Sequence, residues 1–174
     1  MADTYDIVYY GDKRLTAKNE KVKEIDNNIR KIAQKMIRTM KEKEGIGLAG
    51  PQVGINKKIV VIDLSFGQKE NSRFMVLINP EIVEYGEEKD VMEEGCLSFP
   101  ELFIEVERSK EVKIKAKTLE GEAIEFEADS FLARVLQHEI DHVNGVVFID
   151  RISPAKKLEI SNKLNKIKNL AEVV

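Results

Sequence analysis

The chain has 174 residues, of which 43% are hydrophobic, enough to bury the core of one domain. Its 28 Lys and Arg residues against 31 Asp and Glu residues give a net charge of −3, which argues against a nucleic-acid-binding module because phosphate contacts need a basic surplus. With one cysteine, no secretory signal and no apolar run near the roughly 18 residues of a membrane span, we expect a cytoplasmic protein with one domain over residues 1–174, no membrane segment and no sequence-specific nucleic-acid binding.

The first predicted helix begins after Asp26, whose side chain can cap it, and ends before Gly45. Its apolar residues follow one another at spacings of four, three, one, three, one and three, which place them on one helical face. They are Ile25, Ile29, Ile32, Ala33, Met36, Ile37 and Met40. We interpret this stripe as a face that packs on the core.

The middle of the chain has the pattern of strands. Residues 58–64 and 74–86 are rich in β-branched side chains and are bounded by Gly, Asn and Pro. Residues 103–118 alternate apolar and charged side chains, which predicts a half-exposed antiparallel strand pair. A turn at 118–121 then leads into a further strand at 123–128. We therefore expect antiparallel sheet in this part of the chain.

Two helices complete the predicted fold. Residues 130–144 are apolar on most of the helical circumference, which indicates a buried helix. One of its stripes consists of Phe131, Val135, His138 and His142. A C-terminal helix is predicted over about 154–172, with Pro154 in its first turn. The fold class is therefore α+β, with antiparallel strands packed around a central buried helix and with N-terminal and C-terminal helices.

The central helix carries a metal-binding pattern. Residues 138–142 read H-E-x-x-H and contain both histidines of the chain. Helical residues four apart share a face, so both imidazoles can bind one ion while Glu139 lies beside it. The alternatives are a pair of core histidines without metal and a closed structural metal site. Burying two imidazoles and a carboxylate without metal would be costly, so we expect a metal-binding helix.

The third ligand has more than one candidate. A metzincin would have a third histidine where this chain has Phe148. A thermolysin-like endopeptidase would use a later glutamate, for which Glu159 is the candidate. Cys96 lies in a glycine-containing bend at 94–98 that follows the strand region, and its thiolate binds such metals well. A lone cysteine is more often a small buried apolar residue, so the residues alone leave the choice open.

Three motifs occur in order along the chain: GIGLAGPQ at 45–52, EGCLS at 94–98 and QHEIDH at 137–142. Together they resemble the peptide deformylase family, and the resemblance extends over nearly the whole chain. It implies that Glu139 is the general acid and base, and that Gln52 and the Leu97 backbone N–H line the oxyanion position. The metal ligands that it implies are Cys96, His138 and His142.

Members of this family remove the formyl group from the N-terminal methionine of newly made bacterial or organellar polypeptides, so the implied partners are N-formyl-methionyl nascent peptides. We therefore expect a metal-dependent amide hydrolase. A bound metal lowers the pKa of a coordinated water from 15.7 toward roughly 7, which makes hydroxide available to attack the formyl carbonyl. Glu139 would take the water proton and hand it to the leaving amine, with release of formate.

One divalent ion per chain is expected. A thiolate with two imidazoles suits Zn²⁺, whereas the resemblance implies Fe²⁺ in the cell and Zn²⁺ or Ni²⁺ in purified protein. The resemblance also implies transient contact of the C-terminal helix with the ribosome; a solvated helix face is the alternative. The lysines of this helix are Lys156, Lys157, Lys163, Lys166 and Lys168.

The residues expected to bind substrate are Ile46, Gly47, Gly95 and Leu97. Ile46 and Leu97 would flank an apolar pocket suited to methionine. Gly45, Gly47 and Gly50 would let the backbone of a peptide approach closely and add as an extra strand.

Two positions depart from the family pattern. Gly50 stands where the family usually has alanine, and we expect it to loosen the turn slightly. Phe103 stands where many bacterial members have an arginine near the substrate backbone, so the preference beyond the first substrate residue is expected to differ.

Two acidic residues near the metal-binding pattern, Glu94 and Asp141, each have more than one predicted role. Glu94 is predicted either to hydrogen-bond a ligand imidazole or pair with Arg108, or to be a surface carboxylate. Asp141 is expected to face away from the two histidines and either to act as a cap or to form an ion pair with Arg134 or Arg151.

Overall fold

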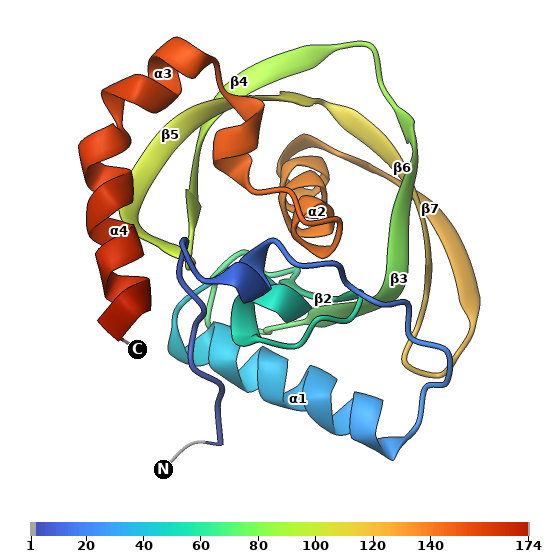
Figure 1. The fold of residues 1–174 in the computed structure, drawn as a ribbon. Helices are drawn as coiled ribbons and strands as arrows, with labels where there is room; N and C mark the ends of the chain where they lie inside the picture. Colours follow the sequence, from blue (N-terminus) through green and yellow to red (C-terminus); the bar gives the residue numbers. More distant parts are fainter. Residues whose placement is uncertain (1–2, 174) are drawn as a thin grey trace.

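The computed structural model describes residues 3–173. Figure 1 looks down α2, which lies in the middle of the molecule with strands on either side. The helices are α1 (Asn27–Glu42), α2 (Ser130–Val143), α3 (Pro154–Glu159) and α4 (Ser161–Val173). The strands are β1 (Gly47–Ala49), β2 (Ile59–Asp63), β3 (Phe74–Tyr85), β4 (Lys89–Cys96), β5 (Phe99–Ser109), β6 (Glu111–Lys117) and β7 (Ala123–Asp129). The predicted α+β class is confirmed.

The strands form two antiparallel sheets, one of five strands in the order β1-β2-β3-β6-β7 and one of the pair β4-β5. The predicted strand pair at 103–118 is wrong, because its two halves belong to different sheets; the predicted neighbour at 123–128 does pair with β6. Only Lys110 separates β5 from β6, too little chain for a hairpin turn. Its N–H donates to Glu88 O and its carbonyl accepts from Ser130 N, so the chain crosses here from one sheet to the other.

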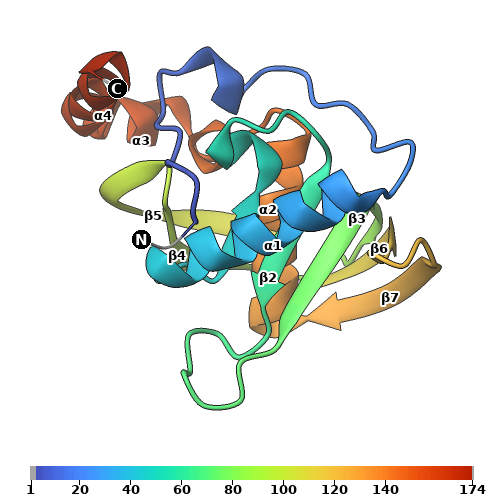
Figure 2. The same cartoon turned by 90° about the horizontal axis from the view of Figure 1, so that it is seen from below.

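Helix α1 covers the outer face of the five-stranded sheet (Figure 2). The Asp26 side chain accepts a hydrogen bond from Ile29 N and caps the helix as predicted. The helix ends at Glu42, and Gly45 N donates back to Met40 O. Its buried stripe packs with Leu48, Ile59, Val61 and Ile78 of the sheet. The predicted core-facing helix is confirmed.

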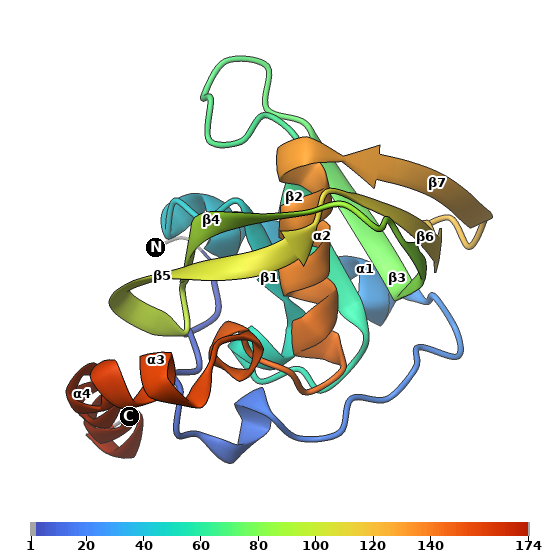
Figure 3. The ribbon, with the colours of Figure 1, turned by 90° about the horizontal axis from the view of Figure 1, so that it is seen from above.

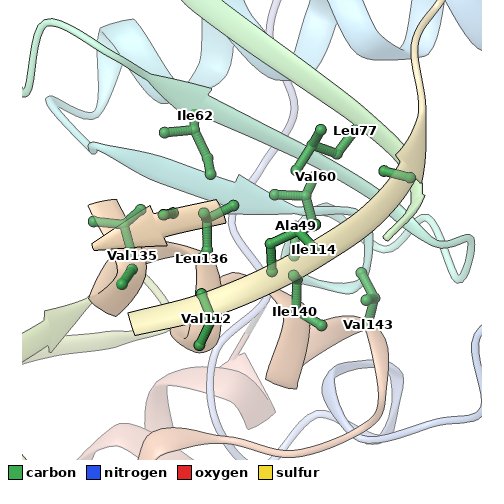
Figure 4. Close-up of a cluster of buried hydrophobic side chains, with 13 residues drawn as sticks. Ala49, Val60, Ile62, Leu77, Val112, Ile114, Val135, Leu136, Ile140 and Val143 are labelled. Atoms are coloured by element: carbon green, nitrogen blue, oxygen red, sulfur yellow. The ribbon is translucent and has the colours of Figure 1, made fainter. Parts of the chain in front are cut away.

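Helix α2 is buried from Ala133 to Val143. One face is apolar and packs on the inner side of the five-stranded sheet, as Figure 4 shows for Leu136, Ile140 and Val143 against Val60. The opposite face meets β4 and β5. The sequence prediction of a central buried helix therefore holds, and the helix has two different partners.

The predicted C-terminal helix is two helices, α3 and α4, with a break at Ile160. The change of direction (Figure 3) lets Leu164 and Ile167 of α4 pack against Phe99 and Phe148. Ser153 caps α3 by accepting from Lys156 N. No helix within residues 3–173 combines the length and the apolar content that crossing a bilayer requires.

Candidate metal centre and active site

Cys96, His138 and His142 come together where the end of β4 meets the C-terminal half of α2. Their ligand atoms all lie within 4.8 Å of one another, and Cys96 Sγ is 3.3 Å from His142 Nε2. The two imidazoles are buried and the thiol is half-buried. This donor set, one sulfur and two nitrogens, matches the three protein ligands of catalytic zinc-type sites. The three residues form a candidate metal-binding group.

The alternative third ligand, Glu159, is not part of this group. It is exposed at the end of α3.

His142 is in the form that can bind a metal. Burial, with the charges of His138 and Arg108, lowers the pKa of His142 well below its usual value, so its imidazole is in the neutral form that binds metal. His142 Nδ1 has no hydrogen-bond partner among the described residues, while Nε2 faces the thiol.

Glu94 hydrogen-bonds His138 through the ring nitrogen that does not face the metal-binding group. Its carboxylate accepts from His138 Nδ1 at 2.8 Å, from Arg108 Nε and Nη2 at 3.0 Å each, and from Arg134 Nη1 at 2.6 Å. Burial opposes its ionisation, but the hydrogen bonds from His138 and Arg108 lower the pKa of Glu94 to about 2. Both predicted contacts, with an imidazole and with Arg108, are present. The carboxylate fixes the ring of His138 and leaves Nε2 as the atom that faces the group.

Asp141 pairs with Arg151 at 2.8 Å, as one of the predictions had it, and also with Arg108 at 2.6 Å. The predicted alternative, Arg134, is wrong. Arg134 precedes Asp141 by two helical turns, about 10 Å along the axis, and binds Glu94 and Asp90 instead. The imidazole, three guanidinium groups and three carboxylates form one network, which is buried except at its two outer members, Asp90 and Arg151.

Glu139 is buried between the metal-binding group and β1. Burial, together with the charge of Glu94, raises the pKa of Glu139 to about 7. Its Oε2 has no hydrogen-bond partner within residues 3–173. A methyl group at Gly47 would lie 2.8 Å from Glu139 Cγ and Oε1, so this glycine lets β1 approach the carboxyl. The group is free to take up and release a proton near neutral pH.

Gln52 is buried in a short 3₁₀ helix over Gly50–Val53. Its Oε1 accepts from Ala49 N at 2.9 Å, which turns Nε2 toward Cys96 Sγ and Ser98 Oγ, each at 3.4 Å. Leu97 follows Cys96 in the turn between β4 and β5. The structure thus places both residues beside the metal-binding group, and their role at an oxyanion stays a prediction.

A cavity of about 690 Å³ opens above this group. Ile46, Gly47, Gly95 and Leu97, the residues predicted to bind substrate, all line it. So does Phe103, whose side chain is 64% exposed at the mouth. Whether these residues bind substrate stays a prediction, but their placement around one cavity agrees with it.

Helix α2 supplies part of the cavity wall that was not predicted from the sequence, with Phe131, Arg134 and Val135. Phe131 and Val135 lie on the stripe that leads at spacings of four and three to His138. That spacing was the available signal, because a stripe that ends at a metal ligand faces the ligand's surroundings. Arg134 precedes His138 by four residues, so the same spacing also pointed to it.

Gly50 does not loosen its turn, contrary to expectation. A methyl group there would lie 2.5 Å from Ile55 O and 2.6 Å from Lys57 O, and Ile55 N donates to Gly50 O. The glycine lets two backbone segments pack tightly inside the fold. The predicted role in peptide approach therefore does not apply to Gly50, which does not line the cavity.

Comparisons with known proteins agree with this geometry. A sequence model of the family described as Polypeptide deformylase matches residues 4–158. A peptide deformylase from Thermotoga maritima is 47% identical over 163 residues, which cover 94% of this chain and 96% of that one. A plant peptide deformylase structure is similar with a TM-score of 0.91 at 36% identity, covering 97% of this chain and 91% of that one. A peptide deformylase from Synechococcus elongatus, solved in complex with actinonin, gives 0.86 at 40% identity, with 95% and 91% covered.

Proposed function

The chain belongs to the polypeptide deformylase family and is an enzyme, and from this premise we propose its reaction in detail. It hydrolyses the N-formyl group of formyl-methionine at the start of newly synthesised polypeptides and releases formate. The observation that supports this most directly is Glu139, a buried carboxyl with a free oxygen and a pKa raised to about 7 beside the metal-binding group.

Cys96 Sγ and the Nε2 atoms of His138 and His142 would hold one divalent ion, Fe²⁺ in the cell and Zn²⁺ or Ni²⁺ in purified protein. When bound, the ion supplies Lewis acidity and lowers the pKa of water beside it to about 7. The Glu94 hydrogen bond to His138 Nδ1 supports this assignment, because metal-binding imidazoles almost always donate their other N–H to an acceptor.

Glu139 would take the proton from the attacking water and pass it to the amine nitrogen as the formyl C–N bond breaks. A carboxyl with a pKa near the working pH suits both transfers. Gln52 Nε2 and Leu97 N–H would donate to the carbonyl oxygen as negative charge develops on it. Such donors contribute about 2.7–4 kcal/mol each when removed singly.

The substrate side chain would lie in the cavity against Ile46, Leu97, Phe131 and Val135, which suits the apolar methionine side chain. Phe103 lies at the mouth of the cavity, where many bacterial family members have an arginine near the substrate backbone. Because phenylalanine offers no positive charge there, the preference for substrate residues after the methionine would depend on apolar contact. The substrate emerges from the ribosome, which supports a cytoplasmic place of action. Transient ribosome contact through the lysines of the C-terminal segment, which lie on α3 and α4, is part of the same proposal.

The test is formate release from a formyl-methionyl tripeptide, with protein purified anaerobically with Fe²⁺ and in parallel with Zn²⁺. Glu139→Gln should lower turnover by about 10²–10⁴-fold while the metal stays bound. Glu127→Gln, an exposed carboxylate on β7 that does not line the cavity, is the matched control and should leave turnover unchanged. Folded, fully metallated protein that releases no formate with either metal would contradict the proposal.

A further inference from the structure

The β4-β5 sheet is tied to α2 mainly through side chains of the helix. Within residues 3–173 this sheet shares no backbone ladder with the five-stranded sheet. The ties come from α2 residues spaced three, one and three apart, which lie on one face: Arg134, Gln137, His138 and Asp141. Cys96 is the last residue of β4. The position of its sulfur relative to the two histidines of α2 therefore depends on these ties.

Arg134 is the first of these residues along α2, and its guanidinium forms hydrogen bonds with both β4 and β5. Its Nη1 donates to Glu94 Oε2 at 2.6 Å on β4 and to Val106 O at 2.8 Å on β5. Its Nη2 donates to Asp90 Oδ1 at 2.7 Å and to Asp90 O at 3.1 Å. The guanidinium thus holds β4 at two points four residues apart, and the second of these, Glu94, precedes Cys96 by two residues.

The charges around Arg134 are balanced although it is buried. Glu94 pairs with Arg134 and Arg108, Asp90 pairs with Arg134, and Asp141 pairs with Arg108 and Arg151, so three carboxylates face three guanidinium groups. A buried charge of this kind is costly unless its geometry and hydrogen bonds are complete. A hydrophobic residue at position 134 would fill the space with less risk, so the arginine points to a requirement for geometry. Arg134 also lines the cavity.

We propose that Arg134 is a positioning residue for the metal centre, and that Asp90 holds its outer end. By binding Glu94 and Asp90 at the same time, Arg134 sets the distance between Cys96 and the two histidines. It also holds Glu94 in its hydrogen bond with His138 Nδ1. The inference rests on the proposed metal centre and is independent of the substrate. Lysine cannot replace it, because an ammonium lacks the planar fork that reaches both carboxylates and Val106 O at once.

The test is the Zn²⁺ affinity of metal-free protein, measured by competition with a chelator, and the visible absorption of Co²⁺-loaded protein, which reports the thiolate and the coordination geometry. Arg134→Lys should weaken Zn²⁺ binding by about 10–100-fold and alter the Co²⁺ bands. Arg151→Lys is the matched control, because Arg151 belongs to the same ion-pair network but does not touch Glu94. It should leave both readouts unchanged.

Asp90→Asn keeps the test decisive if Arg134→Lys fails to fold. The Asp90 side chain is 41% exposed, so its loss should be tolerated, and it should weaken Zn²⁺ binding in the same direction by a smaller factor. Unchanged Zn²⁺ affinity and Co²⁺ bands in the folded Arg134→Lys protein, or in Asp90→Asn if only that variant folds, would overturn the proposal. Since no substrate is used, a failure of the deformylase reaction would not affect this result.

Discussion

The two faces of α2 are both buried, yet different forces hold them. Toward the five-stranded sheet, Leu136 and Ile140 make apolar contacts with no hydrogen bond to satisfy. Toward the β4-β5 sheet, Arg134, Gln137 and Asp141 are paired with named partners at 2.6–3.2 Å. Apolar packing tolerates changes of shape that keep the volume, whereas a buried ion pair that loses one partner leaves a charge without compensation. Both faces contribute to stability, but only the polar face fixes the geometry of the metal-binding group.

Substitutions on the polar side of α2 should lower the unfolding free energy more than substitutions on its apolar side. Glu94→Gln keeps the shape of the side chain but removes the charge that Arg108 and Arg134 share. We expect metal-free protein to lose about 3–5 kcal/mol of unfolding free energy, measured by urea denaturation. Glu81→Gln is the control, because Glu81 pairs with Lys21 on the surface and such pairs contribute about 0–1 kcal/mol. Equal losses in the two variants would erase the contrast between buried and exposed pairs.

The apolar face should lose stability without losing geometry. Leu136→Ala removes a fully buried side chain and should cost about 2–5 kcal/mol, while Zn²⁺ affinity stays as in the unmodified protein. Leu136→Met, which keeps the volume, should cost under about 1.5 kcal/mol. If Leu136→Ala weakened Zn²⁺ binding as strongly as Arg134→Lys, the two faces would not be separable.

The two buried carboxyls of the site respond to pH in opposite directions. The pKa of Glu94 is lowered to about 2, so its contribution to stability is present above its unfolded pKa, 4.5, and is lost as the pH falls toward 2. The pKa of Glu139 is raised to about 7. The folded state therefore holds a proton that the unfolded state releases, and metal-free protein should lose stability as the pH rises from about 4.5 to about 7.

Glu139→Gln isolates this second effect. The variant should match the unmodified protein near pH 4 and exceed it near pH 8 by on the order of 3 kcal/mol. Urea denaturation of both metal-free proteins across this range measures the difference. A difference that does not depend on pH would show that burial does not shift Glu139.

At Gly47, strand β1 of the five-stranded sheet lies directly against Glu139. Gly47→Ala places a methyl group against Glu139, and overpacking of this kind should cost about 1–3 kcal/mol of stability. Turnover should fall by a larger factor than the stability loss explains, because the displaced group is the proposed base. Comparing formate release at a temperature where both proteins are folded tests this, and unchanged turnover would mean that Glu139 has room to move.

The parts that sequence predicted well are those that local spacing decides. The interval of four between His138 and His142 fixes a shared helical face, and the cap at Asp26 lies within one turn of its helix. The resemblance to a known family, now confirmed, selected Cys96 over Glu159 as the third ligand, a choice that the residues alone left open. The metal-binding group was predictable for these two reasons.

The parts that sequence missed depend on contacts between distant segments. Strand β4 has no regular alternation, since Val91 and Met92 are exposed while Glu94 is buried. Because β4 was not predicted, Arg134 was considered as a partner of Asp141 on its own helix and not of Glu94 and Asp90 on β4. The crossing at Lys110 was hidden in the same way, because a continuous strand-like pattern does not record a change of sheet.

The separate ladder of β4-β5 has a consequence for how the protein opens in solution. Secondary structure joined to a fold mainly through side chains can unfold locally while the rest stays intact. In metal-free protein, amide hydrogens of β4 and β5 should exchange with solvent through such partial opening, and those of β2, β3 and β6 only when the whole chain unfolds. Because a bound ion would join Cys96 to α2, it would bring the exchange of both sheets to a common rate. Cys96 would thus lie on the segment that detaches first when the ion is lost.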